Sequence, residues 1–117
     1  MTPAQCLRVA GALVLLIAAG PTRAADEPSH GSPADPGAIA KGRAVFDNYG
    51  CSGCHTLADA GATGTVGPSF DGDANLTEAF AIERVTNGQG QMPAFGGSMS
   101  PEEIKAVAAY LVHAAKK

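Results

Sequence analysis

The stretch Gly50-Cys51-Ser52-Gly53-Cys54-His55 contains two cysteines three positions apart and a histidine directly after the second. Two thiols at this spacing on one helical turn lie along one edge of a porphyrin, where they can add to the two haem vinyl groups as thioethers. The adjacent histidine is then directed at the iron. Cys-x-x-Cys-His is the pattern of covalent haem attachment. It predicts one haem c bound through Cys51 and Cys54, with His55 as an iron ligand.

Other kinds of site also use cysteine pairs. A structural zinc site usually needs four ligands, whereas His30 and His113 lie far in sequence from the Cys51–His55 motif. A thioredoxin-like redox pair follows a strand in a βαβ unit, and the sequence shows no such pattern. A plain disulfide is compatible with an exported protein, but it would leave His55 unexplained. Haem attachment accounts for all three residues of the motif.

Residues 1–24 have the pattern of a secretory signal peptide. Arg8 precedes the apolar run Val9 to Ala19, Gly20-Pro21 ends it, and Thr22-Arg23-Ala24 puts small residues where a signal peptidase reads them. The run is about half the length needed to cross a bilayer. We therefore expect cleavage, with Cys6 leaving in the signal, export to the periplasm or beyond, and no stable membrane insertion of the mature chain.

Removal of the signal makes the chain more acidic. Without Arg8 and Arg23, six of the eight Lys and Arg remain against all eleven Asp and Glu, a net charge of −5 with His neutral. Such a chain lacks the basic patch that nucleic acid requires. It would instead be attracted to redox-partner proteins with a basic docking face.

The mature chain is predicted to be one all-α domain, residues 37–117, after a polar, Pro-rich linker at 25–36. Helical periodicity predicts helices at about 37–49 and 77–87, and a third after the capping pattern Ser100-Pro101-Glu102-Glu103. No alternating run predicts a strand. The 15 Gly, 8 Pro and 5% aromatic residues favour a loop-rich fold around a cofactor. A haem would fill the space beneath the long loop 56–75.

An electron-carrying haem needs a second axial ligand, for which the chain offers Met92, Met99, His30 and His113. We favour Met92, because it lies in an irregular Gly-rich loop and the following proline biases it toward an extended backbone. Met99 directly precedes the cap of the last helix. His113 is interpreted as a surface residue, and His30 lies in the linker.

Taken together, the haem motif, the run Gly-Gln-Met-Pro-Ala-Phe at 90–95 and the capped last helix resemble the class I monohaem cytochromes c, in particular the short bacterial c5, c-551 and c6 kind. The resemblance covers about Gly37 to His113. It implies an all-α cytochrome c fold of three to five helices around one covalent haem. It also implies iron ligation by His55 and Met92, and a hydrogen bond from the His55 ring to the carbonyl of Pro68.

The same resemblance implies that Gly42 and Phe46 of the first helix cross the last helix near Tyr110. The function it implies is one-electron transfer between periplasmic redox partners, without an enzyme's substrate site, because protein ligands fill both axial positions. The alternative is a haem c subunit of a larger periplasmic dehydrogenase complex. A third hypothesis is a gas-binding haem domain in which the distal ligand is displaced.

Overall fold

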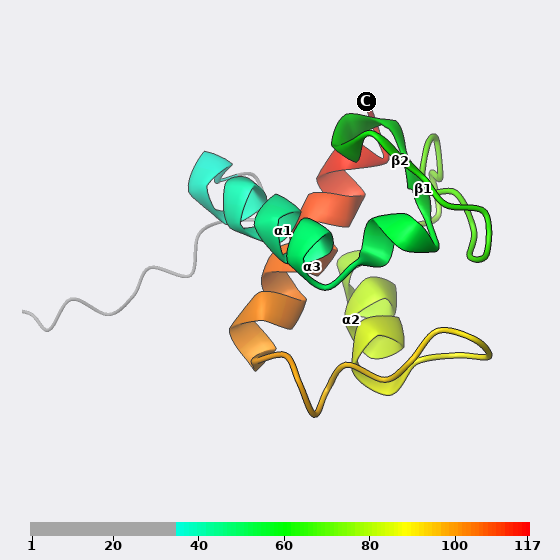
Figure 1. Ribbon diagram of the computed structural model, residues 1–117. Helices are drawn as coiled ribbons and strands as arrows, with labels where there is room; N and C mark the ends of the chain where they lie inside the picture. Colours follow the sequence, from blue (N-terminus) through cyan, green and yellow to red (C-terminus); the bar gives the residue numbers. More distant parts are fainter. Residues whose placement is uncertain (1–34) are drawn as a thin grey trace, which may run out of the picture.

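The computed structural model describes residues 35–117. The predicted signal peptide (1–24) and residues 25–34 of the predicted linker, including His30, lie outside the described residues. The described part is mostly helical, as predicted, with two short 3₁₀ turns and one small sheet (Figure 1). Its elements are α1 (Pro36–Asn48), η1 (Cys51–Gly53), β1 (Thr56–Leu57), η2 (Ala58–Ala60), β2 (Ala62–Thr63), α2 (Glu78–Asn87) and α3 (Pro101–Ala114).

Helix α1 begins at Pro36, one residue earlier than the predicted boundary between linker and domain. The Asp35 carboxylate accepts a hydrogen bond from the backbone N–H of Gly37 at 2.8 Å and so caps the helix. Pro36 fits the first helical position because its missing N–H would have no partner there. The last two residues of the predicted linker are therefore the cap and the first residue of α1.

Helices α2 and α3 begin at the predicted caps. The Thr77 hydroxyl accepts a hydrogen bond from Phe80 N–H at 3.2 Å. Ser100 and Glu103 form a reciprocal capping box, in which Glu103 N–H donates to the Ser100 hydroxyl and Ser100 N–H donates to the Glu103 carboxylate. These local bonds fix where α3 starts. Gly88 has a φ of 70° and ends α2 with a backbone that side-chain-bearing residues avoid.

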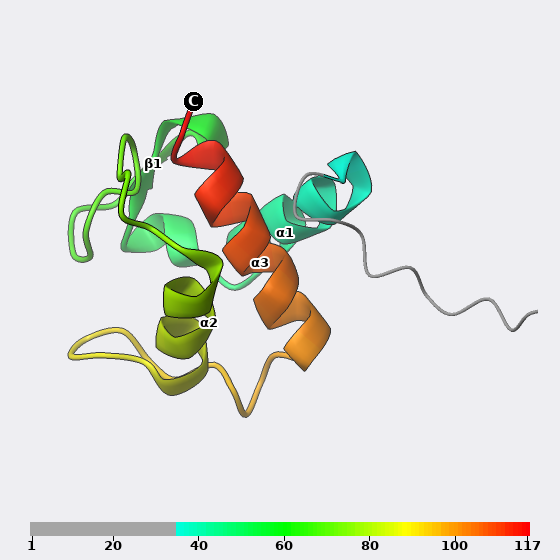
Figure 2. The ribbon, with the colours of Figure 1, turned by 180° about the vertical axis from the view of Figure 1, so that it is seen from behind.

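The core is the crossing of α1 over α3, which also packs against α2 (Figures 1 and 2). A Cβ on Gly42 would lie 2.6 Å from the Cβ of Tyr110 and would overlap the carbonyl of Ala106. One helical turn later, Phe46 meets the Tyr110 ring edge to face, with 6.0 Å between centroids. Phe46 and Tyr110 are fully buried. The crossing implied by the family resemblance is therefore present.

The expectation of no strand was wrong for residues 56–63. β1 and β2 pair antiparallel, with Thr56 opposite Thr63 and Leu57 opposite Ala62. The strands are two residues long, too short for alternation to be visible in sequence. The connection between them is η2, and it ends at Gly61, whose φ of 66° allows the chain to reverse.

Asp59 in η2 ties this hairpin to the helices. The hydroxyl of Tyr110 and the ammonium of Lys117 each donate to its carboxylate at 2.8 Å, and Arg43 Nη1 lies 3.6 Å away. These partners, foremost the Lys117 hydrogen bond, lower the pKa of Asp59. Lys117, Tyr110 of α3 and Arg43 of α1 thus all contact the carboxylate of Asp59.

Within residues 35–117, no helix has both the length and the apolar character needed to cross a membrane.

Candidate functional site

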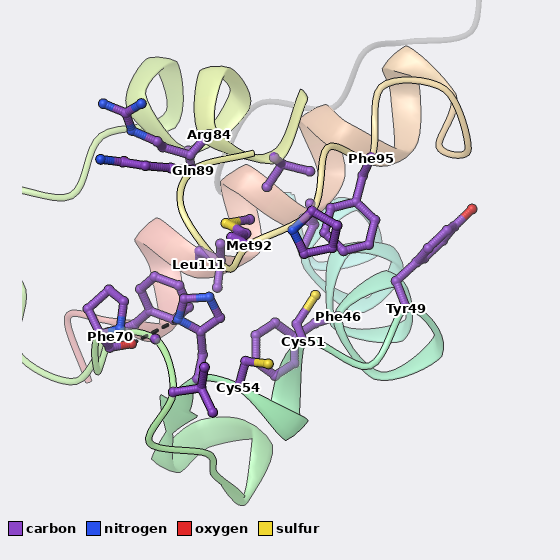
Figure 3. Close-up of a pocket in the computed structure, with 18 of the residues that line it drawn as sticks. Phe46, Tyr49, Cys51, Cys54, Phe70, Arg84, Gln89, Met92, Phe95 and Leu111 are labelled. Carbon is purple, nitrogen blue, oxygen red and sulfur yellow. Dashed lines mark hydrogen bonds between the residues drawn. The ribbon is translucent and has the colours of Figure 1, made fainter. Parts of the chain in front are cut away.

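A cavity of about 790 Å³ opens between the helices and the loops. Such a volume lies in the range of pockets that take cofactors, roughly 300–1,000 Å³. Most of its surface is apolar, with contributions from Phe46 of α1, Val85 of α2 and Leu111 of α3. Figure 3 labels ten of the lining residues: Phe46, Tyr49, Cys51, Cys54, Phe70, Arg84, Gln89, Met92, Phe95 and Leu111.

The Cys51–His55 turn forms one wall of the cavity. Gly50 enters it with a φ of 72°, and the N–H groups of Cys54 and His55 both donate to the carbonyl of Cys51, at 3.1 and 3.0 Å. Both thiols are free and face the cavity (Figure 3). Burial raises the pKa of the Cys51 thiol to about 11. The turn therefore presents the two thiols at one edge of an apolar space.

His55 is the one polar residue in the buried interior of residues 35–117, with 8% of its surface exposed. Its Nδ1 lies 2.9 Å from the carbonyl oxygen of Pro68, the bond drawn dashed in Figure 3. A carbonyl can only accept, so Nδ1 carries a proton, and the tautomer that this bond selects has its lone pair on Nε2. Phe70 stacks on the ring, with 4.5 Å between centroids and 20° between planes. The imidazole is thus fixed in orientation and tautomer.

Gly67 leaves the space that the His55 ring occupies. A Cβ on Gly67 would lie 2.5 Å from Cε1 of the ring and 2.8 Å from Nδ1. The Gly67 N–H also donates to the carbonyl of Cys54 at 2.7 Å, which holds the 66–70 segment against the cysteine turn. A glycine is required here by close packing, not by an unusual backbone angle.

Met92 enters the cavity from a loop after α2. Gln89 and Met92 exchange two backbone hydrogen bonds of 3.0 Å, which close a tight turn over Gly90, whose φ is 59°. Further along, Phe95 N–H donates to the carbonyl of Val85 at 2.9 Å. This bond holds the part of the loop that follows Met92 against α2. The Met92 side chain is partly buried and lines the cavity. A thioether is thereby held at a defined place.

The other ligand candidates lie elsewhere. Met99 is 4% exposed, belongs to the hydrophobic core and does not line the cavity. His113 is exposed on α3, as predicted. Within residues 35–117, no three side chains of His, Cys, Asp or Glu come together as a metal site of their own. The cavity therefore brings together Cys51, Cys54, His55 and Met92, with Pro68 behind the histidine.

Sequence reasoning missed the residues that hold the loop with Met92 against α1. The hydroxyl of Tyr49 lies 3.2 Å from the carbonyl of Ser98 and 3.4 Å from the Glu103 carboxylate, and its ring meets Phe95 edge to face at 6.2 Å. Burial, and then the charge of Glu103, raise the pKa of Tyr49. The periodicity of the sequence placed Tyr49 only at the end of the helix predicted at about 37–49. Its contacts join segments about fifty positions apart, so no local pattern indicated them.

The donor set fits a covalently attached haem. Two thiols lie at one edge of an apolar cavity of suitable size. The His55 imidazole, whose Nδ1 is bonded to Pro68, and the Met92 thioether reach the same cavity from separate segments. Thiol, imidazole and thioether are the groups by which proteins hold haem c and its iron. The lining, all of it within residues 35–117, contains no Asp or Glu.

Comparison with known proteins agrees with this assignment. Residues 37–111 match the family model described as cytochrome C oxidase, cbb3-type, subunit III. Cytochrome c6 of Picosynechococcus sp. is 43% identical over 98 residues, which cover 74% of this chain and 81% of that protein. Cytochrome c6 of Limnospira maxima is 36% identical over 92 residues, covering 69% and 98%.

Solved structures resemble the fold as well. The c-type cytochrome SorU from Sinorhizobium meliloti superposes with a TM-score of 0.65 at 41% identity, over 71% of this chain and 97% of that one. Cytochrome c6 from the diatom Phaeodactylum tricornutum gives 0.54 at 37% identity, over 66% and 93%. The chain therefore belongs to the class I monohaem c-type cytochromes of the c6/c5 kind, electron carriers with one covalently bound haem c.

Proposed function

We propose that this protein is an exported one-electron carrier whose haem is bound by Cys51 and Cys54 and whose iron is ligated by His55 Nε2 and Met92 Sδ. The haem supplies the ferric/ferrous couple. The observation that carries the proposal is that His55 and Met92, on separate segments, line the same cavity while Pro68 takes the other ring nitrogen. A carbonyl partner of this kind fixes the ring and raises its basicity.

The same residues would influence the reduction potential of the haem iron. A thioether ligand and an apolar cavity favour the ferrous state, so we expect a higher potential than a bis-histidine site would give. If His55 and Met92 both hold the iron, no coordination position would be left for a substrate, which fits a carrier and not an enzyme. The cavity's apolar wall also keeps water from the iron.

Partners would dock at the cavity mouth. Val66 and Phe80 line the cavity and are the large apolar side chains most exposed in residues 35–117, at 61% and 51%. A small apolar rim of this type suits a transient contact, in which electrons pass quickly and the complex then separates. The mature net charge of −5 favours partners with a basic face. The signal pattern in residues 1–24 supports a periplasmic location.

The ligand assignment is tested with two methionine variants. Met92→Ala is expected to abolish the Met–iron charge-transfer band of the ferric protein, and Met99→Ala, which removes a core side chain outside the cavity, is expected to keep it. If Met99→Ala loses the band and Met92→Ala keeps it, the assignment is wrong. Carbon monoxide should fail to bind the reduced wild-type protein near neutral pH, and ready binding would favour a gas-binding domain instead.

A second candidate is a haem subunit of a larger oxidoreductase complex. It is favoured by one observation, that the matching family model describes a subunit of an oxidase. The site chemistry would be the same, but the partner would be permanent. Size-exclusion chromatography of the native protein separates the two: elution alone supports the free carrier, and co-elution with a stoichiometric partner supports the subunit.

A further inference from the structure

Phe70 differs from the other aromatic side chains that line the cavity, because its ring stacks on that of His55 (Figure 3). The ring centroids are 4.5 Å apart and the planes differ by 20°. The other two aromatic pairs within residues 35–117 meet edge to face. Phe70 is also partly buried against the core. The stacked arrangement thus occurs at the residue that we propose as the proximal ligand.

Backbone hydrogen bonds fix the position of Phe70 relative to this histidine. The Phe70 N–H donates to the carbonyl of Thr56, the residue directly after His55, at 3.0 Å. The residue after Phe70 is held as well, because the carboxylate of Asp71 accepts a hydrogen bond from the N–H of Ala58 at 2.8 Å. The segment that carries the phenyl ring is therefore bonded along β1 and the start of η2, beside the attachment turn.

The hydrogen bond to Pro68 does not by itself fix the rotation of the His55 ring, because a hydrogen bond stays favourable at angles up to about 30° from linear. Two further neighbours restrict the rotation. One is the phenyl of Phe70, and the other is the backbone of Gly67. A Cβ on Gly67 would lie 2.8 and 3.0 Å from Nδ1 and Nε2, little more than its 2.5 Å from Cε1, so Gly67 lies over the face of the ring. Rotation about the Cβ–Cγ bond of His55 would drive an edge of the imidazole into one of these neighbours.

We propose that Phe70 is a positioning residue for electron transfer: its ring sets the angle at which the plane of the His55 imidazole stands above the haem. The proposal rests on the proposed ligation of the iron by His55. Residues around a metal-binding histidine orient its ring and so tune the metal. The plane of an axial imidazole selects the iron d orbital that overlaps with its π electrons. It therefore decides over which edges of the porphyrin the unpaired spin of ferric iron is spread.

The test is a spectroscopic signature of the ferric holoprotein. The paramagnetic shifts of the haem methyl groups in proton NMR report the angle of the axial imidazole plane. Phe70→Leu keeps an apolar side chain but removes the flat ring, so we expect the wild-type order of the methyl shifts to be lost or their spread to narrow. Phe70→Tyr keeps a flat ring and is expected to retain the wild-type order.

Phe80→Leu is the matched control. It makes the same exchange at another aromatic residue of the lining, one whose ring packs with the guanidinium of Arg84. We expect this variant to keep the wild-type order of the methyl shifts. A Phe70→Leu protein with the wild-type order and spread would overturn the proposal. An equal change in Phe70→Leu and Phe80→Leu would also overturn it, because loss of any aromatic ring from the lining would then have the same effect.

A measurement on the wild type covers the case in which the Phe70 variants yield no holoprotein. In the diamagnetic ferrous state, nuclear Overhauser effects between the ring protons of Phe70 and those of His55 support the proposal, and their absence contradicts it. The same spectra test the ligation, because a porphyrin shifts the ring protons of an iron-bound imidazole strongly upfield. If this upfield shift is missing, the proposed ligation by His55 fails. An upfield-shifted His55 without contact to Phe70 refutes the role of Phe70 alone.

Discussion

The ring of His55 donates a hydrogen bond from Nδ1 to the carbonyl oxygen of Pro68, thirteen residues along the chain, at 2.9 Å. The bond needs a particular distance between two loops, and that distance is set by the glycine just before the proline. The side chain that we propose as the proximal ligand is therefore positioned by the backbone of the segment opposite it.

Gly67→Ala should disturb this arrangement. The added methyl would lie 2.5 Å from Cε1 of His55, so either the ring or the 66–70 segment must move. We expect a loss of about 1–3 kcal/mol in the free energy of unfolding, measured by chemical denaturation, together with a changed ferric spectrum. Gly97→Ala is the matched control, because a Cβ there meets nothing within 4 Å. Equal stability of the two variants would show that the His55 ring can accommodate the added methyl group, which would contradict the prediction.

Cys54→Ala should give little stable holoprotein, because one of the two proposed thioether links is lost. The yield is measured by absorbance after purification, and covalent attachment by whether haem stays with the protein in acid–acetone. Ser52→Ala lies in the same turn and removes no sulfur, so its yield should be near that of the wild type. A normal yield of Cys54→Ala with acid-resistant haem would contradict shared attachment.

Tyr49→Phe should loosen the loop that carries Met92. The variant keeps the contact with the Phe95 ring but loses the hydroxyl bonded to Ser98 and Glu103, a change worth about 0.5–1.5 kcal/mol. We expect the Met–iron band to disappear at a lower temperature than in the wild type. Tyr110→Phe is the comparison, since its hydroxyl bonds Asp59 on the far side of the fold from this loop. If both variants lose the band at the same temperature, Tyr49 acts only through overall stability.

Asp59 should make stability depend on pH in the acid range. Its pKa is lowered in the folded protein, first by the Lys117 hydrogen bond and then by that of Tyr110. Its contribution is therefore present above the unfolded value, about 3.9, and is lost as the pH falls through the folded value. Asp59→Asn should lower the free energy of unfolding at neutral pH by about 1 kcal/mol and have little effect in strong acid. A difference that is constant with pH would rule out this titration as its origin.

Features with local causes were predictable from the sequence. The start of α3 depends on Ser100 and Glu103, which are three residues apart and bond one another, so the pattern and the structure coincide. The attachment turn is likewise a local motif. Met92 was favoured because of the loop around it, and the structure places it in the cavity while Met99 lies in the core.

Features that depend on tertiary contacts were not predictable. Arg84 follows helical spacing from Ala81, but nothing in sequence shows that its Nε is desolvated beside a cavity. The stacking of Phe70 on His55 and the contacts of Asp59 join segments that are far apart or weakly patterned. The hairpin at 56–63 was missed because two-residue strands carry no alternation.

The contact of Gly42 with Ala106 and Tyr110 has a consequence for the order of events during synthesis. It joins the first helix of the described chain to the last one, across more than sixty residues, and Phe46 is buried only when that contact forms. During synthesis the amino end emerges first, so α1 stays without its partner until α3 has followed it. Through that interval Cys51 and Cys54 belong to an open polypeptide, and their sulfur atoms are accessible before the cavity around them has closed.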